Sequence, residues 1–111
     1  MFALAACGGG SLGPDGPSGV DPAIPVAQIS SGDAQTFCEW SVDAQGGAGH
    51  VERCGGDLTV KTETVANCVA SFLEATCDAT VGEIEDCIFA IDGNGCRIFS
   101  EEQCSVLFEC L

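Results

Sequence analysis

Basic residues are scarce in this sequence of 111 residues. Arg53, Lys61 and Arg97 stand against 17 Asp and Glu, which gives a formal net charge of −14. A nucleic-acid site needs several cations to neutralise phosphates, and a surface that attracts anionic lipid headgroups needs them as well. The composition therefore excludes both kinds of surface. It predicts an acidic, self-repelling surface that is open to cationic partners or to weak association with divalent ions.

Sequence signatures of metal sites and catalytic sites are also missing. No two cysteines are spaced as C-x-x-C and His50 is the single histidine, which argues against zinc sites and thioredoxin-like redox motifs. The segment Asp92–Gly95 begins like a calcium loop, but Arg97 and Gln103 stand where an EF-hand has its glycine and glutamate. No nucleophile elbow or phosphate-binding glycine loop occurs. We expect no metal, no cofactor and no enzymatic activity.

Cysteine, in contrast, is abundant, with nine residues in the chain. This density in a short chain is typical of a disulfide scaffold, which forms in an oxidising compartment such as the periplasm or the cell exterior. No apolar run reaches the 18 residues of a membrane-spanning helix. Because nine is an odd number, one cysteine is left without an intramolecular partner.

The first cysteine ends the sequence Leu4-Ala5-Ala6-Cys7, which resembles the lipobox of bacterial lipoproteins. The resemblance implies that the thiol of Cys7 carries a diacylglyceryl group, that a peptidase cleaves before it, and that the new N-terminus is acylated. Two or more chains anchor a protein stably in a membrane. We expect residues 1–6 to be the remnant of a signal peptide whose charged start lies upstream. By the same resemblance, Gly8 rather than Asp after the cysteine favours the outer membrane.

Residues 7–32 are interpreted as the lipidated cysteine and a disordered linker. Gly8–Gly32 holds all four prolines and seven of the fifteen glycines, with two charges and no cysteine. Such a composition offers little apolar surface to offset the entropy lost on ordering. We therefore expect a flexible tether that ends where the folded domain begins.

Helical periodicity dominates residues 33–111, which we expect to form an all-α bundle of about four short helices stapled by disulfides. Gly46 to Lys61 is expected to be an irregular loop in which Leu58–Val60 is briefly extended, and Trp40 is expected in the core. The expected start signals of the helices are, in chain order, Asp33, Thr62, the capping box Thr80–Glu83, and the capping box Ser100–Gln103.

The cysteines that remain after Cys7 form an even set, sufficient for four disulfides. Eight cysteines allow 105 pairings, and sequence alone does not choose among them. An antiparallel hairpin of the second and third helices favours Cys68–Cys87, and Cys38–Cys54 is a second choice. The expected disulfide cysteines are Cys38, Cys54, Cys68, Cys77, Cys87, Cys96, Cys104 and Cys110.

Taken together, these patterns favour a non-catalytic, lipid-anchored protein of the bacterial cell envelope. We expect a monomer, held to the membrane through Cys7, that presents a rigid acidic module to a protein or envelope partner. The alternative is a secreted disulfide-rich effector, either an inhibitor or a small hydrolase, that uses the loop around His50. A hydrolase also needs a nucleophile, and the sequence assigns none to His50.

Overall fold

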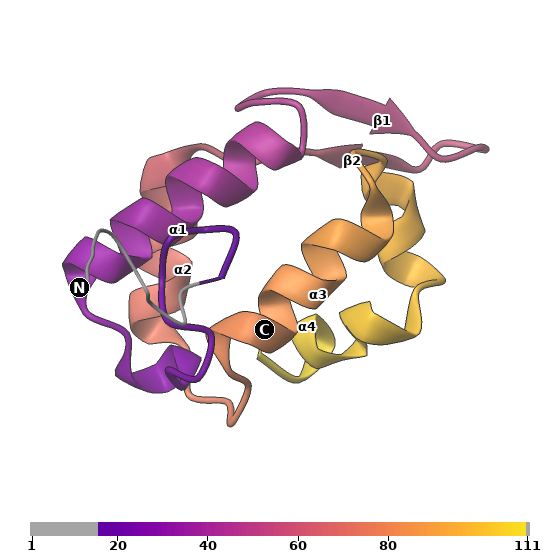
Figure 1. Cartoon of the computed structure of the whole chain (residues 1–111). Coiled ribbons are helices and arrows are strands. Elements are labelled where there is room, and N and C mark those ends of the chain that lie inside the picture. The colour runs from indigo at the N-terminus through magenta and orange to yellow at the C-terminus, as the bar shows by residue number, and fades with distance from the viewer. Residues whose placement is uncertain (1–15, 111) are drawn as a thin grey trace.

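Helices make up just over half of residues 16–110, the part of the protein that the computed structural model describes (Figure 1). The described chain has four α-helices: α1 (Ser31–Ala44), α2 (Val65–Glu74), α3 (Val81–Ile91) and α4 (Ser105–Cys110). Helices α1 and α2 pack side by side, and α3 lies between this pair and the C-terminal helices. Three short 3-10 helices complete the helical part: η1 (Val26–Gln28), η2 (Gly95–Phe99) and η3 (Glu102–Cys104).

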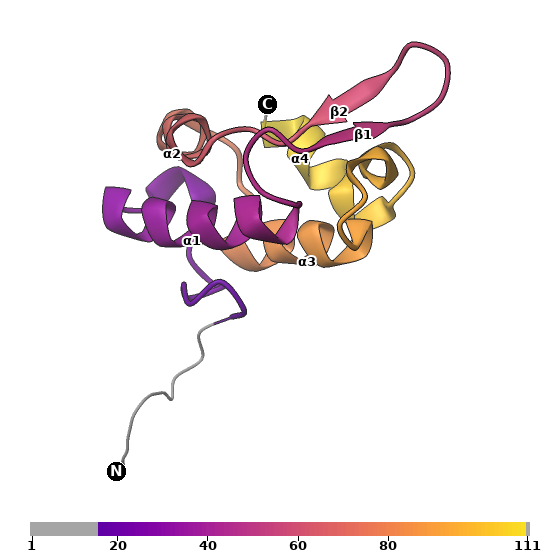
Figure 2. The same ribbon diagram turned by 90° about the horizontal axis from the view of Figure 1, so that it is seen from above.

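The prediction of a helical fold is confirmed, but the fold is not purely α-helical, because it also contains a two-stranded hairpin. Strand β1 (Val51–Arg53) pairs antiparallel with β2 (Thr59–Lys61), with Glu52 opposite Val60. The extended segment expected near Val60 is therefore confirmed, but its partner strand was missed. Gly55 and Gly56 both adopt positive φ in the turn, where side chains are disfavoured, and this lets the chain reverse. The hairpin extends past the ends of the helices (Figure 2).

Side-chain caps set the starts of the long helices. The hydroxyl of Ser30, not the carboxyl of Asp33, caps α1, and it accepts a hydrogen bond from the Asp33 backbone N–H. Thr64 caps α2 in the same way, two residues after the expected Thr62. The capping box before α3 is confirmed: the Thr80 hydroxyl accepts from the Glu83 N–H, and the Glu83 carboxylate accepts from the Thr80 N–H.

The expected capping box of the fourth helix is wrong. The hydroxyl of Ser100 donates to the carbonyl of Arg97, and its N–H bonds to the same residue, so Ser100 closes η2 instead of opening a helix. The chain then forms η3 before α4 begins at Ser105. Gln103 lies inside η3.

The prediction of a disordered linker is wrong for residues 16–32, because this segment packs against the helices. Val20, Val26 and Ile29 are buried, and η1 lies within the segment. The N–H of Val26 donates to the carbonyl of Ala79 at 2.8 Å, and further backbone bonds join the segment to the start of α3. The average composition hides these few apolar residues among the prolines and glycines. The folded domain therefore includes residues 16–32 and does not begin at Asp33.

Four disulfides hold the helices together, and neither preferred pairing is correct. Cys68 bonds to Cys38 on α1, not to Cys87, because α2 packs against α1 and does not form a hairpin with α3. Cys38 is consequently not available to Cys54. The four bonds are Cys38–Cys68, Cys54–Cys96, Cys77–Cys110 and Cys87–Cys104.

The main core lies where α1, α2 and α3 meet. Phe37 is fully buried, and its ring contacts that of Phe72 edge-on at 5.0 Å between centroids. Trp40 is half-buried and lies between Phe37 and the exposed ring of Phe89, so the expectation of a core tryptophan holds in part. A smaller cluster around Cys87, Ile91 and Cys104 joins α3 to the C-terminal helices.

Candidate functional site

A hollow beside α3 is lined by acidic side chains, and we call it the acidic basin. Its volume is about 530 Å³. No Lys or Arg occurs among the described residues that line it. With so many like charges around one concavity, a negative potential is concentrated there. The basin is defined by the carboxylates of Asp78, Glu83, Asp86, Glu102 and Glu109.

The acidic basin is built on a cross-linked frame. Cys77 lies in its wall and bonds to Cys110 at the end of α4, while Cys87–Cys104 joins α3 to η3. The carboxylate of Glu83 is engaged in the capping box. The other four acidic side chains of the basin are exposed on the same frame. The frame therefore fixes the backbone positions from which these side chains extend.

A second concavity is apolar and lies between the α1–α2 pair and the α3–α4 side of the molecule. We call it the apolar cavity; its volume is about 270 Å³ and it is partly open to solvent. Several buried core side chains form its wall, and three of the four disulfides contribute a cysteine to it. The apolar wall includes Val26, Phe37, Phe72, Ile84, Ile88, Ile91 and Leu107.

Polar groups collect at one end of the apolar cavity. Glu63 is the one charged side chain among the described residues that line it. The adjacent Thr62 donates its hydroxyl to the Gln45 carbonyl at 3.1 Å, which brings Gln45 close to the backbone beside Glu63. The Gln45 side-chain amide in turn donates to the hydroxyl of the buried Ser41 at 2.9 Å. Glu63 is exposed on one side, but the protein around it partly limits hydration of its carboxyl and raises its pKa above the ordinary value.

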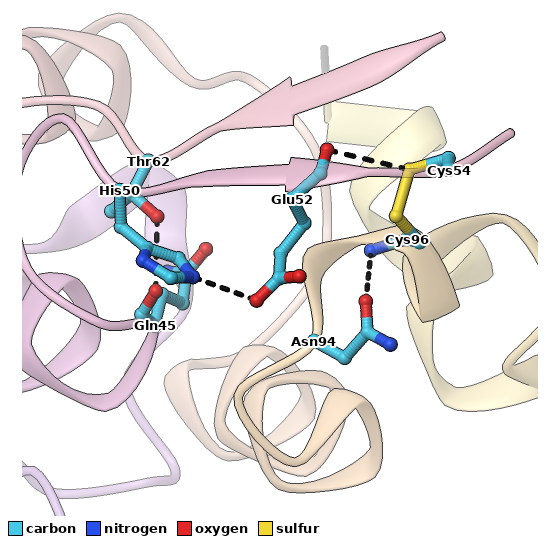
Figure 3. A network of polar contacts seen from close by, with 7 residues as sticks. All are labelled: Gln45, His50, Glu52, Cys54, Thr62, Asn94 and Cys96. Atoms are coloured by element: carbon cyan, nitrogen blue, oxygen red, sulfur yellow. Dashed lines mark hydrogen bonds and ion pairs between the residues drawn. A yellow bond between two sulfur atoms is a disulfide. The ribbon is translucent and has the colours of Figure 1, made fainter.

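His50 belongs to a polar network that joins the hairpin to the end of α1 (Figure 3). Its Nε2 lies 2.7 Å from Oε1 of Glu52, and both side chains are about one third exposed. The ring packs directly on Gly46, where a Cβ would collide with it. The Thr62 hydroxyl of the same network donates to the Gln45 carbonyl, so it is already committed as a donor. The arrangement supplies an acid–base pair and no assigned nucleophile.

Glu85 is an acidic residue buried on α3. It is 3% exposed, and its carboxylate accepts hydrogen bonds from the hydroxyl of Ser18 at 2.6 Å and from the Ser18 N–H at 3.2 Å. The sequence holds a signal for this burial, because position 85 continues the apolar spacing of Val81 and Ile84 on α3. Its neighbour Asp86 is exposed and lines the acidic basin, as expected for adjacent helical residues.

The cysteines predicted to be lipidated or disulfide-bonded do not form one site. Cys7 lies outside the described residues, whereas every cysteine from Cys38 to Cys110 forms a disulfide. Glu63 gave no sequence signal, because it lies in a polar stretch just before α2. Within residues 16–110, no three His, Cys, Asp or Glu side chains are grouped so as to hold a metal ion. None of the helices in that range is long and apolar enough to cross a bilayer.

Comparison of the chain with known proteins gives no relative from which a role can be transferred. No protein-family model, no curated protein and no solved structure matches it. A role for this protein is therefore inferred from the residues of the acidic basin, the apolar cavity and the His50 network themselves.

Proposed function

We propose that this protein is a non-catalytic, lipid-anchored protein of the bacterial cell envelope that presents its acidic basin to a basic protein or peptide. The sequence Leu4-Ala5-Ala6-Cys7 supports the anchor through its resemblance to a lipobox. The disulfides support it as well, because they use all eight cysteines that follow. An outer-membrane location follows from Gly8 by the same resemblance.

The proposed interaction with a basic partner is supported mainly by the acidic basin. It places five carboxylates around one concavity in a chain with 17 acidic and three basic residues. Complementary charge speeds encounter with a basic partner and selects against acidic ones. The disulfides Cys77–Cys110 and Cys87–Cys104 keep the basin in shape before the partner arrives, which lowers the entropy lost on binding.

The anchor is tested by the intact mass of protein expressed in bacteria from the full upstream reading frame. We expect a chain that begins at Cys7, carries acyl groups and has lost eight thiol hydrogens to disulfides. A Cys7→Ser variant is expected to lack the acyl mass and to leave the membrane fraction. A free Cys7 thiol in the mature wild-type protein would overturn the anchor.

The interaction is tested with a lysine-rich peptide and two variants of equal net charge. The basin variant combines Asp86→Asn, Glu102→Gln and Glu109→Gln. The control removes three charges at other exposed positions through Glu39→Gln, Asp57→Asn and Glu74→Gln. We expect the basin variant to weaken binding about tenfold, since each exposed pair contributes roughly 0.5 kcal/mol. Equal weakening in both variants would show that net charge alone attracts the peptide.

The alternative, a secreted effector that uses His50, is favoured by the 2.7 Å contact between His50 and Glu52. An enzyme of this kind needs the imidazole, so a His50→Ala variant would remain folded and lose turnover of ester or amide substrates. In our proposal His50→Ala leaves peptide binding at the acidic basin unchanged. Turnover by the wild-type protein that disappears in His50→Ala would replace our proposal with the alternative.

A further inference from the structure

The apolar cavity has the size and the walls of a small-molecule site. Its volume is about 270 Å³, and its walls include the buried side chains Phe37, Ile84 and Ile91. For comparison, an apolar cavity of about 150 Å³ in another protein stays dry and binds benzene. The apolar cavity therefore has room for an aromatic ring or a short alkyl chain together with a small polar head.

The polar end of the cavity fixes which head group fits. Glu63 supplies a carboxylate, Gln45 lies close to the backbone beside it, and no basic side chain occurs among the described lining residues. A carboxylate accepts hydrogen bonds, so it favours a ligand that donates them and favours a cation most strongly. The net charge of −14 adds to this preference and disfavours fatty acids and other anions.

Disulfides make each wall of the cavity rigid. Cys68, Cys87 and Cys110 line the cavity, and each belongs to a different disulfide. One of these bonds joins α1 to α2 on one side, and the other two join α3 and the residues before it to η3 and α4 on the other side. An apolar cavity without such support tends to collapse, because the surrounding side chains gain contacts when they close over it. A site that is already formed needs little rearrangement when a ligand enters, which favours binding.

We propose that the apolar cavity binds a small cationic amphiphile: an apolar ring or short alkyl chain of about ten carbon atoms that carries a protonated amine. The apolar part contacts Phe37 and Ile88, and the ammonium group pairs with the carboxylate of Glu63. This site is distinct from the acidic basin and requires neither the lipid anchor nor a protein partner. No bond is made or broken, so the ligand leaves unchanged.

The test uses the oxidised full chain and three probes of the same shape: phenylbutylamine, phenylbutanol and phenylbutyrate. Binding is followed by amide chemical shifts and by calorimetry. We expect the amine to bind with a Kd on the order of 0.1–1 mM, the alcohol about tenfold more weakly, and the carboxylate not at all. The shifts should change at Ile84, Ile88 and Phe72. Equal binding of the amine and the carboxylate would overturn the choice of head group.

Three variants separate this site from the acidic basin. Glu63→Gln is expected to remove the preference for the amine over the alcohol, whereas Glu39→Gln, which removes one charge from the exposed face of α1, keeps it. Ser71→Phe places a ring at the exposed rim of the cavity and is expected to block both probes. Amine binding that survives Glu63→Gln and Ser71→Phe but is lost in the basin variant would overturn the cavity proposal and leave the proposed function standing.

Discussion

At the scale of single residues, the contact between Ser18 and Glu85 joins the N-terminal segment to α3. Both residues are buried, and the hydroxyl-to-carboxylate distance is 2.6 Å. Hydrogen bonds to charged groups are stronger than neutral ones, and a buried carboxylate that loses a donor keeps its desolvation cost. This contact explains how a segment rich in glycine and proline remains attached to the helices.

Ser18→Ala is expected to lower the free energy of unfolding by about 1–3 kcal/mol, because it leaves the Glu85 carboxylate with the weaker backbone donor. The loss is measured by urea denaturation, together with the rate of proteolytic cleavage in residues 16–29. Ser31→Ala, at an exposed position on α1, is the control and is expected to change neither value. If the two variants have equal stability, the Ser18–Glu85 contact contributes nothing.

Glu63 is an exposed residue whose carboxyl is partly desolvated, so its negative charge has a small cost in folding stability. Its pKa is raised by desolvation above an ordinary value of 4.5, so the folded state binds the proton more tightly than the unfolded chain does. The stability contributed by this group is present below the unfolded pKa of about 4.5. It is lost as the pH rises through the raised, folded-state pKa.

Glu63→Gln should therefore raise the Tm relative to the wild type, and the difference should grow as the pH rises from about 4 to 7. Glu39→Gln removes the same charge without the desolvated setting, so it controls for the reduced overall repulsion. Thermal unfolding of the three proteins across this pH range measures the effect. A Tm difference that is the same for both variants at every pH would contradict the desolvation of Glu63.

At the scale of elements, the hairpin is held by contacts at its two ends. Cys54 near its turn bonds to Cys96 in η2, and Thr62 after β2 bonds to the end of α1. Between these points the strands are only three residues long and their side chains are largely exposed. A two-stranded hairpin of this kind is marginal by itself.

Replacing Cys54 and Cys96 with alanine is expected to free the hairpin locally while α1, α2 and α3 stay folded. The protein should lose up to about 2–4 kcal/mol, the usual contribution of one disulfide. Amide hydrogen exchange measures this: protection should fall in residues 51–61 and persist in the helices. The matched pair Cys38→Ala and Cys68→Ala should instead reduce protection in α1 and α2. Helices that lose protection in the first variant would contradict a local role.

At this scale, the sequence predicts features that depend on residues close together in the chain. The capping box of Thr80 and Glu83 depends on residues three positions apart, and it was predicted correctly. The pairing of Cys68 depends on which helix packs against α2, and nothing in the local pattern decides between α1 and α3. The sequence does not predict the apolar cavity for the same reason, because its lining comes from all four α-helices, η1 and η2.

The N-terminal segment shows how an average over composition misleads. Val20, Val26 and Ile29 are few among the surrounding glycines and prolines, yet all three are buried. Proline also fixes the φ angle of its own residue, so Pro22 and Pro25 lower the entropy lost when the segment orders against the start of α3. Gly82 is required where α3 meets this segment, since a Cβ there would collide with Pro22.

At the scale of the whole molecule, charge repulsion opposes the disulfides. With a net charge of −14, the folded chain brings acidic groups closer together than the unfolded chain does. Among the described residues, Arg97 forms an ion pair with Glu101 at 2.8 Å. This pair lies at the surface, so it contributes little to the free energy of unfolding. The disulfides therefore stabilise a folded domain that repulsion between its surface charges destabilises.

The Tm of the oxidised protein should accordingly rise when NaCl increases from about 0.01 to 0.15 M, because the screening length falls from about 30 to 8 Å. We expect a rise of roughly 4–8 °C, which corresponds to about 1 kcal/mol for a domain of this size. Calorimetry at fixed pH measures it, and KCl should give the same result. A Tm that stays constant or falls would show that repulsion is not a major cost.

The attachment of residues 16–29 to α3 also decides how the domain responds to mechanical force. A load applied at the N-terminus meets hydrogen bonds first, at Ser18–Glu85 and along the start of α3, whereas the helices behind them are covalently cross-linked. The segment therefore yields before the helices do. Because Val26 forms part of the wall of the apolar cavity, we expect tension on the N-terminus to open that cavity before any helix unfolds.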